Sequence, residues 1–388
     1  MEDVEVVGAG MHRFGRFPEL SLKDLGRVAT VRALDDAGLS LRDVQAVYSG
    51  NSLAGLLTGQ EQIRGQTVVR ELGIEGVPVI NVENACASGS TAFREAVAAV
   101  SAGMAEVVLV LGHEKMFVGD RAKSLEALRS AADIDVTGGL GLQFTAIYAM
   151  RLRHRLDEGS LRLADLAGAT VKSHAAGARN PYAQHRDEVT ADQVLGSKMI
   201  ADPLTLLMCG SISDGAAAVV VARRGTVAAA GRPRVRVRAS AMRTARSARA
   251  DGEPSVATET ADAAYQQSGL GPSDLDVLEV HDAMAPGELL YYEQLGLCEY
   301  AEAGRLLDDG VTSLGGKHVV NPSGGLSSRG HPVGATGVAQ LAELTWQLRG
   351  EAGPRQVEHA RIALAHNSGG WTDGDSAVCN VHILEAVA

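Results

Sequence analysis

The chain has 388 residues and a formal net charge of −11, with 45% hydrophobic and 21% charged residues. This length and composition are typical of a globular protein with one large α/β domain or two closely packed domains. The acidic balance argues against nucleic acid as a partner, because such binding depends on many Lys and Arg contacts to phosphate.

The first half of the chain alternates predicted strands and helices. Apolar runs predict strands at residues 4–10, 44–48, 77–82 and 107–111, and helical periodicity predicts helices at residues 22–37 and 88–101.

The N-terminal MEDVEVVGAG has no basic stretch before an apolar one, and the longest apolar run, at residues 215–222, is far shorter than the roughly 20 residues that span a bilayer. We therefore expect a cytoplasmic protein without a membrane segment.

A helical insertion and a boundary are predicted in the middle of the chain. Residues 115–200 are rich in Arg, His, Gly and Ala and lack strand patterning, so they are expected to form a helical and loop-rich insertion over one face. RRGTVAAAG, at residues 223–231, separates an apolar strand from the alternating RPRVRVRAS. We therefore predict an N-terminal half at residues 1–224 and a C-terminal half at residues 232–388.

The same alternation returns in the second half. Strands are predicted at residues 235–238, 275–280, 362–365 and 377–383, and helices at residues 258–267, 286–295 and 334–348. Residues 37–47 align without gaps on residues 268–278, and both segments predict a helix, a glycine cap, an acidic turn and a strand. A duplication explains this match, but so does the frequent use of Gly and Asp in helix-to-strand turns.

One cysteine stands out as a candidate nucleophile. The four cysteines, Cys86, Cys209, Cys298 and Cys379, lie far apart, so we expect neither a zinc site nor a disulfide framework. Cys86 lies in NVENACASGS, where an apolar strand gives way to a helix within a few small residues. A helix N-terminus lowers the pKa of such a thiol, whereas most single cysteines are buried as small hydrophobic residues. The setting of Cys86 favours the nucleophile.

Three further turns carry polar residues that could serve this thiol. His331 lies between glycines in RGHPVGATG just before a helix, where a base could be aimed, and no G-x-x-x-x-G-K-[ST] phosphate loop is present. His281, in LEVHDAMAP, follows a predicted strand and could donate to an oxyanion or simply pair with a carboxylate. Asn367, in ALAHNSGG, could supply a donor or merely form a turn.

Taken in order, these segments resemble the motifs of the thiolase superfamily. NACASGS resembles its nucleophile motif, GHPVGATG its histidine motif and HDAM its H-D-C-F element. The last element is similar to that of the sterol-carrier-protein-type, or lipid-transfer, branch. The resemblance implies a five-layer αβαβα fold with two duplicated halves, usually in a homodimer. It also implies that Cys86 carries the acyl group, that His331 activates Cys86 and that His281 lies at an oxyanion or acid-base position.

The departures from the family pattern concern its second catalytic cysteine. The resemblance places Asn367 and Ala283 where the family has thiols, so the substrate proton should come from His281, His331 or an ordered water, and that group should titrate near neutrality. We expect thiolytic cleavage of a 3-oxoacyl-CoA, or the reverse Claisen condensation, with no bound cofactor or metal and with coenzyme A as substrate or product. Related proteins imply two alternatives: a CoA-thioester aldol lyase that works with a small OB-fold/zinc-ribbon partner, and a non-catalytic acyl-CoA or lipid carrier.

Coenzyme A requires cationic partners for its phosphates. The segment RPRVRVRASAMRTARSARA offers several arginines, of which we select Arg243, Arg246 and Arg249 as candidate CoA ligands. The strict alternation at residues 232–238 is equally typical of a half-exposed strand whose arginines are solvated.

Overall fold

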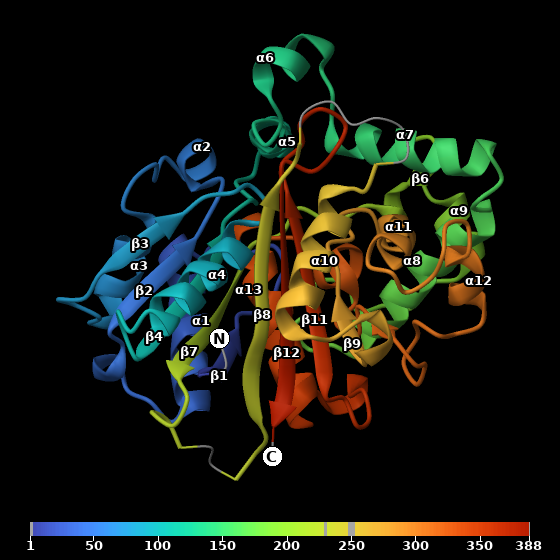
Figure 1. Ribbon diagram of the computed structural model, residues 1–388. Helices are drawn as coiled ribbons and strands as arrows, with labels where there is room; N and C mark the ends of the chain where they lie inside the picture. The colour runs from blue at the N-terminus through green and yellow to red at the C-terminus, as the bar shows by residue number, and fades with distance from the viewer. Residues whose placement is uncertain (1–2, 229–230, 247–252, 388) are drawn as a thin grey trace.

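A mixed β-sheet runs through the whole molecule (Figure 1). The computed structural model describes residues 3–228, 231–246 and 253–387. Within these residues, ten strands pair in the order β10-β9-β11-β12-β8-β1-β7-β4-β2-β3. The first half contributes β1 (Val4–Met11), β2 (Ala46–Gly50), β3 (Val79–Val82), β4 (Val107–Glu114) and β7 (Gly215–Arg223). The second half contributes β8 (Arg234–Thr244), β9 (Val277–Glu279), β10 (Val319–Val320), β11 (Ile362–Gly369) and β12 (Val378–Val387).

The two halves of the sheet have the same topology. Numbered along the chain within each half, the strands lie in the spatial order 3-2-4-5-1 on both sides. In each half the second strand is parallel to both neighbours, and the fifth is antiparallel to both of its neighbours. β1 and β8 join the halves through the pairs Glu5–Arg236 and Val6–Val235. The expected duplication is therefore present in the fold.

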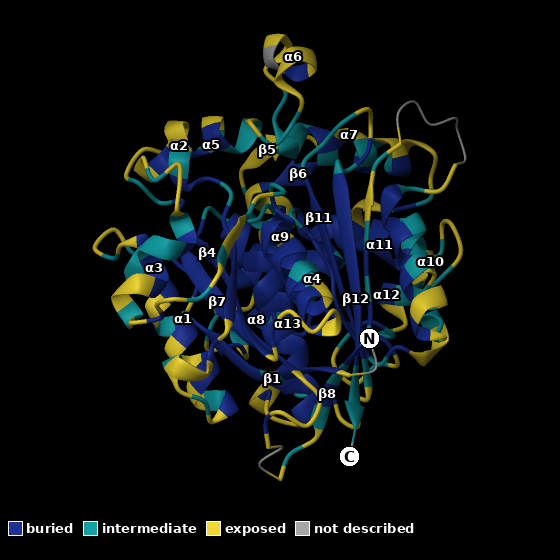
Figure 2. Cartoon of the chain, turned by 60° about the vertical axis from the view of Figure 1, so that its left-hand side comes forward, coloured by how far each residue is buried: buried dark blue, intermediate teal, exposed yellow. Residues whose placement is uncertain are grey.

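Helices cover the sheet in three layers. The outer face of the first half carries α1 (Leu22–Ala37) and α3 (Arg64–Leu72), and the outer face of the second half carries α8 (Leu163–Ala178), α10 (Val256–Ser268) and α11 (Glu288–Gln294). α4 (Ser88–Ser101) and α13 (Val333–Arg349) lie between the halves, and all of α13 is buried (Figure 2). One apolar cluster combines these two helices with strands of both halves, which completes the expected αβαβα layers.

The aligned turns of the two halves are structurally equivalent. Gly38 and Gly269 end α1 and α10 with φ angles of 66° and 71°, in the left-handed region that favours glycine. Asp43 then accepts a hydrogen bond from the Ser40 N–H at 2.7 Å, and Asp274 accepts one from the Gly271 N–H at 2.8 Å. The sequence match at residues 37–47 and 268–278 therefore corresponds to a repeated structure.

The segment between β4 and β7 forms a cap over one end of the sheet (Figure 1). Its helices, besides α8, are α5 (Arg121–Arg129), α6 (Ile134–Thr137), α7 (Phe144–Asp157) and α9 (Ala191–Gly196), followed by the hairpin of β5 (Met199–Ala201) and β6 (Leu204–Thr205). Elsewhere, α2 (Ala54–Thr58) and α12 (Ala303–Asp308) are short surface helices. Among the residues that the structure describes, none of the helices combines the length and apolar character needed to cross a bilayer.

Candidate active site

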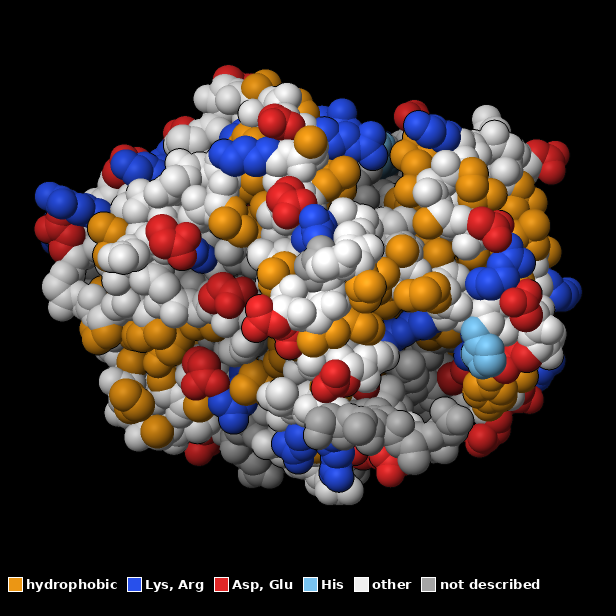
Figure 3. Space-filling model, turned by 90° about the horizontal axis from the view of Figure 1, so that it is seen from above, with side chains coloured by type: hydrophobic (Ala, Val, Ile, Leu, Met, Phe, Trp, Pro, Cys, Tyr) orange, Lys and Arg blue, Asp and Glu red, His pale blue; other side chains and the backbone are white. Residues whose placement is uncertain are grey.

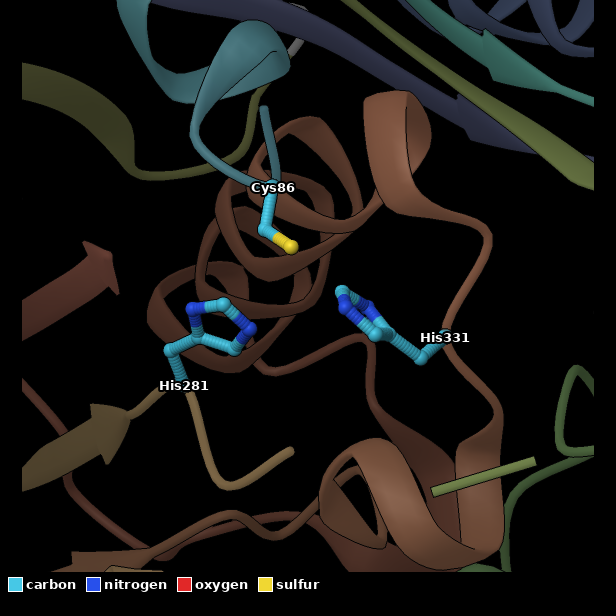
Figure 4. A group of neighbouring side chains, drawn as sticks. All are labelled: Cys86, His281 and His331. Carbon is cyan, nitrogen blue, oxygen red and sulfur yellow. The ribbon is translucent and has the colours of Figure 1, made fainter. Parts of the chain in front are cut away.

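The turn that carries Cys86 is tightly held between β3 and α4. Ala85 has a φ of 48°, a left-handed conformation that is uncommon for a residue other than glycine. The Ser88 hydroxyl donates to the Ala85 carbonyl at 2.6 Å and accepts from the Asn84 N–H at 2.9 Å. These bonds fix the strained turn, so that the Cys86 side chain points toward two histidines (Figure 4).

Three segments that are far apart in the sequence meet at this point. Cys86, His281 and His331 each offer a sulfur or nitrogen atom, and these atoms all lie within 4.8 Å of one another. The rings of His281, which follows β9, and His331, which precedes α13, have centroids 5.1 Å apart. All three side chains line a cavity of about 550 Å³ under the cap. The structure thus brings together the predicted nucleophile, base and oxyanion residue.

The hydrogen bonds of His331 make its Nε2 a proton acceptor. Its Nδ1 lies 2.7 Å from the Thr336 hydroxyl, which donates its single proton to the Pro332 carbonyl at 3.0 Å. The hydroxyl must therefore accept from Nδ1–H, which leaves a lone pair on Nε2. Burial, together with the neighbouring His281 and Arg329, holds the pKa of His331 well below its usual value, so the ring is neutral at pH 7.

The hydrogen bonds of His281 give the opposite tautomer. The Ser368 N–H donates to its Nδ1 at 3.2 Å, so the proton of the neutral ring is on Nε2. This Nε2–H is buried and has no partner among the described residues. Burial lowers the pKa of His281 to about 4, so the ring remains a neutral donor at pH 7. Cys86, His281 and His331 lie close enough together to bind one metal ion. Ligation through Nε2 of His281 would, however, need the ring proton on Nδ1, and the Ser368 N–H that donates to Nδ1 disfavours this tautomer.

The expectation that the helix N-terminus lowers the pKa of Cys86 is wrong for the resting site. Burial and the nearby Glu114 carboxylate raise the pKa of the thiol to about 12, against the opposing effect of the backbone N–H groups of Cys86 and Gly370. Neither His281 nor His331 has a pKa near neutrality, which also contradicts the expected neutral titration. The site at rest therefore pairs a neutral thiol with neutral imidazoles.

Asn367 is not brought into the cavity. On β11 the cavity is lined by Ser368 and Gly369, whereas the Asn367 side chain lies on the other face, next to Gly337 of α13. The cavity instead contains Ala283 and a second thiol, Cys209, whose segment folds back so that the Gly210 N–H donates to the Ala283 carbonyl at 2.9 Å. Cys209 was missed because residues 209 and 283 are adjacent only in the folded chain.

Two of the selected arginines, Arg243 and Arg246, also lie outside the cavity lining. Arg243 and Arg246 are exposed, and Arg246 pairs with Glu259 at 3.0 Å. Arg249 lies outside the described residues. In the part of the chain that the structure describes, the arginines that line the cavity are Arg16, Arg121 and Arg151, which come from three separate segments. No motif in the sequence connects them.

Comparison with known proteins agrees with this architecture. The family described as "Thiolase, N-terminal domain" matches residues 4–225, and "Thiolase C-terminal domain-like" matches residues 239–381. An acetyl-CoA acetyltransferase of Methanothermobacter thermautotrophicus is 40% identical over 97% of this chain and 99% of the relative. Benzoylsuccinyl-CoA thiolase subunit BbsB of Thauera aromatica is 38% identical over 95% of this chain and 94% of the relative. Human sterol carrier protein 2 is 38% identical over 94% of this chain and 70% of the relative.

Solved structures show the same fold. A chain of the Ltp2-ChsH2(DUF35) aldolase superposes with a TM-score of 0.81 at 23% identity, over 99% of this chain and 98% of the other. Human mitochondrial 3-ketoacyl-CoA thiolase in complex with CoA gives a TM-score of 0.74 at 20% identity, over 100% of this chain and 98% of the other.

The chain belongs to the thiolase family. The predicted family, the αβαβα fold and the enzyme class, an acyltransferase of the thiolase type, are confirmed.

Proposed function

We propose that this enzyme cleaves a 3-oxoacyl-CoA by thiolysis, or runs the reverse Claisen condensation, through an acyl group on Cys86. The observation that carries the proposal is the meeting of Cys86, a proton acceptor on His331 and an unpartnered N–H on His281 in one cavity. A nucleophile, a base and an oxyanion donor are what acyl transfer requires.

The neutral resting state defines the first step. His331 Nε2 takes the Cys86 proton as the sulfur attacks the ketone carbon of the substrate. The backbone N–H groups of Cys86 and Gly370, which interact with the sulfur, can stabilise the oxyanion that forms beside it. The bond between C2 and C3 then breaks, and its electron pair passes to the enolate of acetyl-CoA. The His281 Nε2–H can donate to that enolate oxygen.

In this scheme the protonated His331 takes the role of the cysteine that the family has at the positions of Asn367 and Ala283. It returns the Cys86 proton to the enolate carbon, which releases acetyl-CoA and leaves acyl-Cys86. The thiol of free CoA then attacks the acyl group and gives its proton to His331 Nε2, which passes that proton to the Cys86 sulfur as it leaves. The products are the shortened acyl-CoA and free Cys86, so every proton is accounted for without a second thiol.

Intact-mass spectrometry tests the proposal. A 3-oxoacyl-CoA offered without free CoA should add the mass of its shortened acyl group to the wild type, and Cys86→Ala should show no adduct and no turnover. Turnover by Cys86→Ala would contradict the scheme and favour the aldol lyase, whereas tight binding without an adduct or turnover would favour the carrier.

The docking of coenzyme A is also proposed. Arg16 and Arg121 line the cavity and are exposed, so they can contact phosphates that enter from solvent. Arg243 and Arg246 would contact CoA only beyond the cavity lining.

We further propose a homodimer and two structural units. β3 is the outermost strand of the sheet, with Ile80 36% exposed, and a second copy could pair with this free edge. The units are residues 1–224, with the insertion at residues 115–200, and residues 232–388. An OB-fold/zinc-ribbon partner, a role in lipid degradation and a cytoplasmic location stay predictions.

A further inference from the structure

One part of the cavity lining combines α7 with the turn between β11 and β12. Tyr148 and Arg151 come from α7, and Trp371 and Ser376 come from the turn. An Arg151 Nη2–H donates to the Gly374 carbonyl at 2.6 Å, which ties the helix to the turn. The Asp375 carboxylate lies 4.0 Å from the same nitrogen. Within the described residues, the hydrogen bond and the ion pair of Arg151 both involve Nη2, so the N–H groups on Nε and Nη1 are available to a ligand.

Trp371 adds a second available donor. Its Nε1 is buried and has no acceptor among the described residues, although buried indole N–H groups usually find one. The residue directly follows Gly370, whose N–H interacts with the Cys86 sulfur. An acceptor on a substrate bound at Cys86 would satisfy this indole.

The charge of the lining favours an anionic ligand here. Among the described residues that line the cavity, three are arginines and none is Asp or Glu. Arg16 lies over the Phe117 ring, at 5.6 Å from its centroid, and Arg121 begins α5, whereas Arg151 belongs to α7. If Arg16 and Arg121 bind the CoA phosphates, Arg151 remains for a second anion. Basic and hydrophobic side chains surround the hollow on this face (Figure 3).

We infer that the acyl group of the substrate carries a carboxylate, which the Arg151 guanidinium binds, with the Trp371 indole N–H as a second donor from the turn that Arg151 contacts. The inference takes its CoA-thioester substrate from the proposed function. It narrows the substrate class to CoA thioesters of dicarboxylic acids, with the distal carboxylate directed toward α7. The guanidinium supplies paired donors that match a carboxylate.

Binding to the Cys86→Ala variant, which cannot be acylated, tests the inference. Glutaryl-CoA and pentanoyl-CoA have the same chain length and differ in the distal carboxylate, and calorimetry gives both dissociation constants. A charged hydrogen bond of ordinary strength predicts that glutaryl-CoA binds about tenfold or more tightly. Adding Arg151→Gln should abolish this preference, Trp371→Phe should reduce it and Arg151→Lys should retain part of it.

Arg153→Gln is the matched control. Arg153 lies on the same helix, outside the cavity lining, and pairs with Asp202, so its loss should leave the preference unchanged. Equal binding of the two thioesters would overturn the inference. So would an Arg151→Gln effect of the same size on both, because Arg151 would then contact CoA itself. The acyl-Cys86 adduct is measured separately on the wild type, so failure of the proposed function and failure of the carboxylate site are distinguishable.

Discussion

At the scale of single residues, one hydrogen bond gives each catalytic candidate histidine its role. Thr336 accepts from Nδ1 of His331, whereas the Ser368 N–H donates to Nδ1 of His281. The first leaves an acceptor toward Cys86 and the second leaves a donor. Two identical side chains in one cavity thus become a base and an oxyanion donor.

This difference predicts separate effects of the two histidines. His281→Ala should lower kcat/KM by about 10²- to 10³-fold, the usual cost of losing one oxyanion donor. It should leave the rate of Cys86 alkylation by iodoacetamide close to that of the wild type, because His331 still takes the thiol proton. His331→Ala should lower both rates. Slow alkylation in His281→Ala would instead show that His281 activates the thiol.

The site residues differ in how far the sequence could predict them. Cys86, His281 and His331 each stand in a short turn of small residues beside a clear strand or helix, so their motifs are visible locally. Asn367 is flanked by the polar residues His366 and Ser368, so alternation could not tell which face of β11 meets the cavity. Arg151 and Trp371 share one part of the lining only because α7 packs near a turn more than 200 residues later in the chain.

At the scale of secondary-structure elements, glycines set the distance between α4 and α13. A Cβ at position 337 would lie 2.5 Å from the Ser90 amide nitrogen, and one at position 89 would lie 2.6 Å from the Gly334 carbonyl. No side chain fits between two backbones this close. Cys86 precedes α4 and His331 precedes α13, so this contact also fixes the distance between them.

Gly337→Ala tests this contact. We expect the free energy of unfolding to fall by about 1 to 3 kcal/mol, as is typical of overpacking. We also expect slower Cys86 alkylation, because the helices must separate. Gly196→Ala is the control, since a Cβ there meets no atom within 4 Å. Urea unfolding and alkylation measure both effects, and wild-type stability of Gly337→Ala would mean that the helices shift at no cost.

Most elements, but not all of their lengths, could be predicted from local patterns. The glycine-capped helices α1 and α10 were expected because cap, acidic turn and apolar strand follow one another. β8 was expected to end at residue 238, where the alternation of Arg and Val ends, but it continues to Thr244. The last residues of β8 pair with the first residues of β12, beginning with Thr244 opposite Val378. This pairing joins segments that are far apart in the sequence, so it leaves no local pattern in the sequence of β8.

At the scale of the whole molecule, the two halves share both the site and the core. Cys86 belongs to the first half, and His281 and His331 belong to the second. Nε2 of His382, on β12, lies 2.8 Å from the Ser90 hydroxyl of α4, and its Nδ1 lies 2.9 Å from the Ser240 hydroxyl of β8. A buried neutral imidazole therefore joins the two halves. Burial lowers the pKa of His382 to about 3.

Buried histidines of this kind predict that the fold is sensitive to acid. Burial lowers the pKa of eight histidines among the described residues, and the shift is largest for five of them, namely His113, His281, His331, His366 and His382. Above the unfolded pKa of about 6.5, each of these neutral histidines favours the folded state. As the pH falls below that value, the unfolded chain binds a proton that the folded chain does not, so this stability is lost. Three carboxyl groups oppose the trend: burial raises the pKa of Glu114 and of Glu279 to about 7, and that of Asp282 well above its usual value, so they add stability as the pH falls.

Since the histidines outnumber the three carboxyl groups, we expect the free energy of unfolding to fall by more than about 1 kcal/mol between pH 6.5 and 5.5, because each proton bound changes it by about 1.4 kcal/mol per pH unit. Urea unfolding at pH 7.5, 6.5 and 5.5 measures this slope. His382→Gln removes one such group and should make the slope shallower, whereas His154→Gln, at a side chain that is 75% exposed, should leave it unchanged. Stability that is flat or rises toward pH 5.5 would mean that the carboxyl groups dominate. The join between the halves at His382 would then not be the acid-sensitive part of the fold.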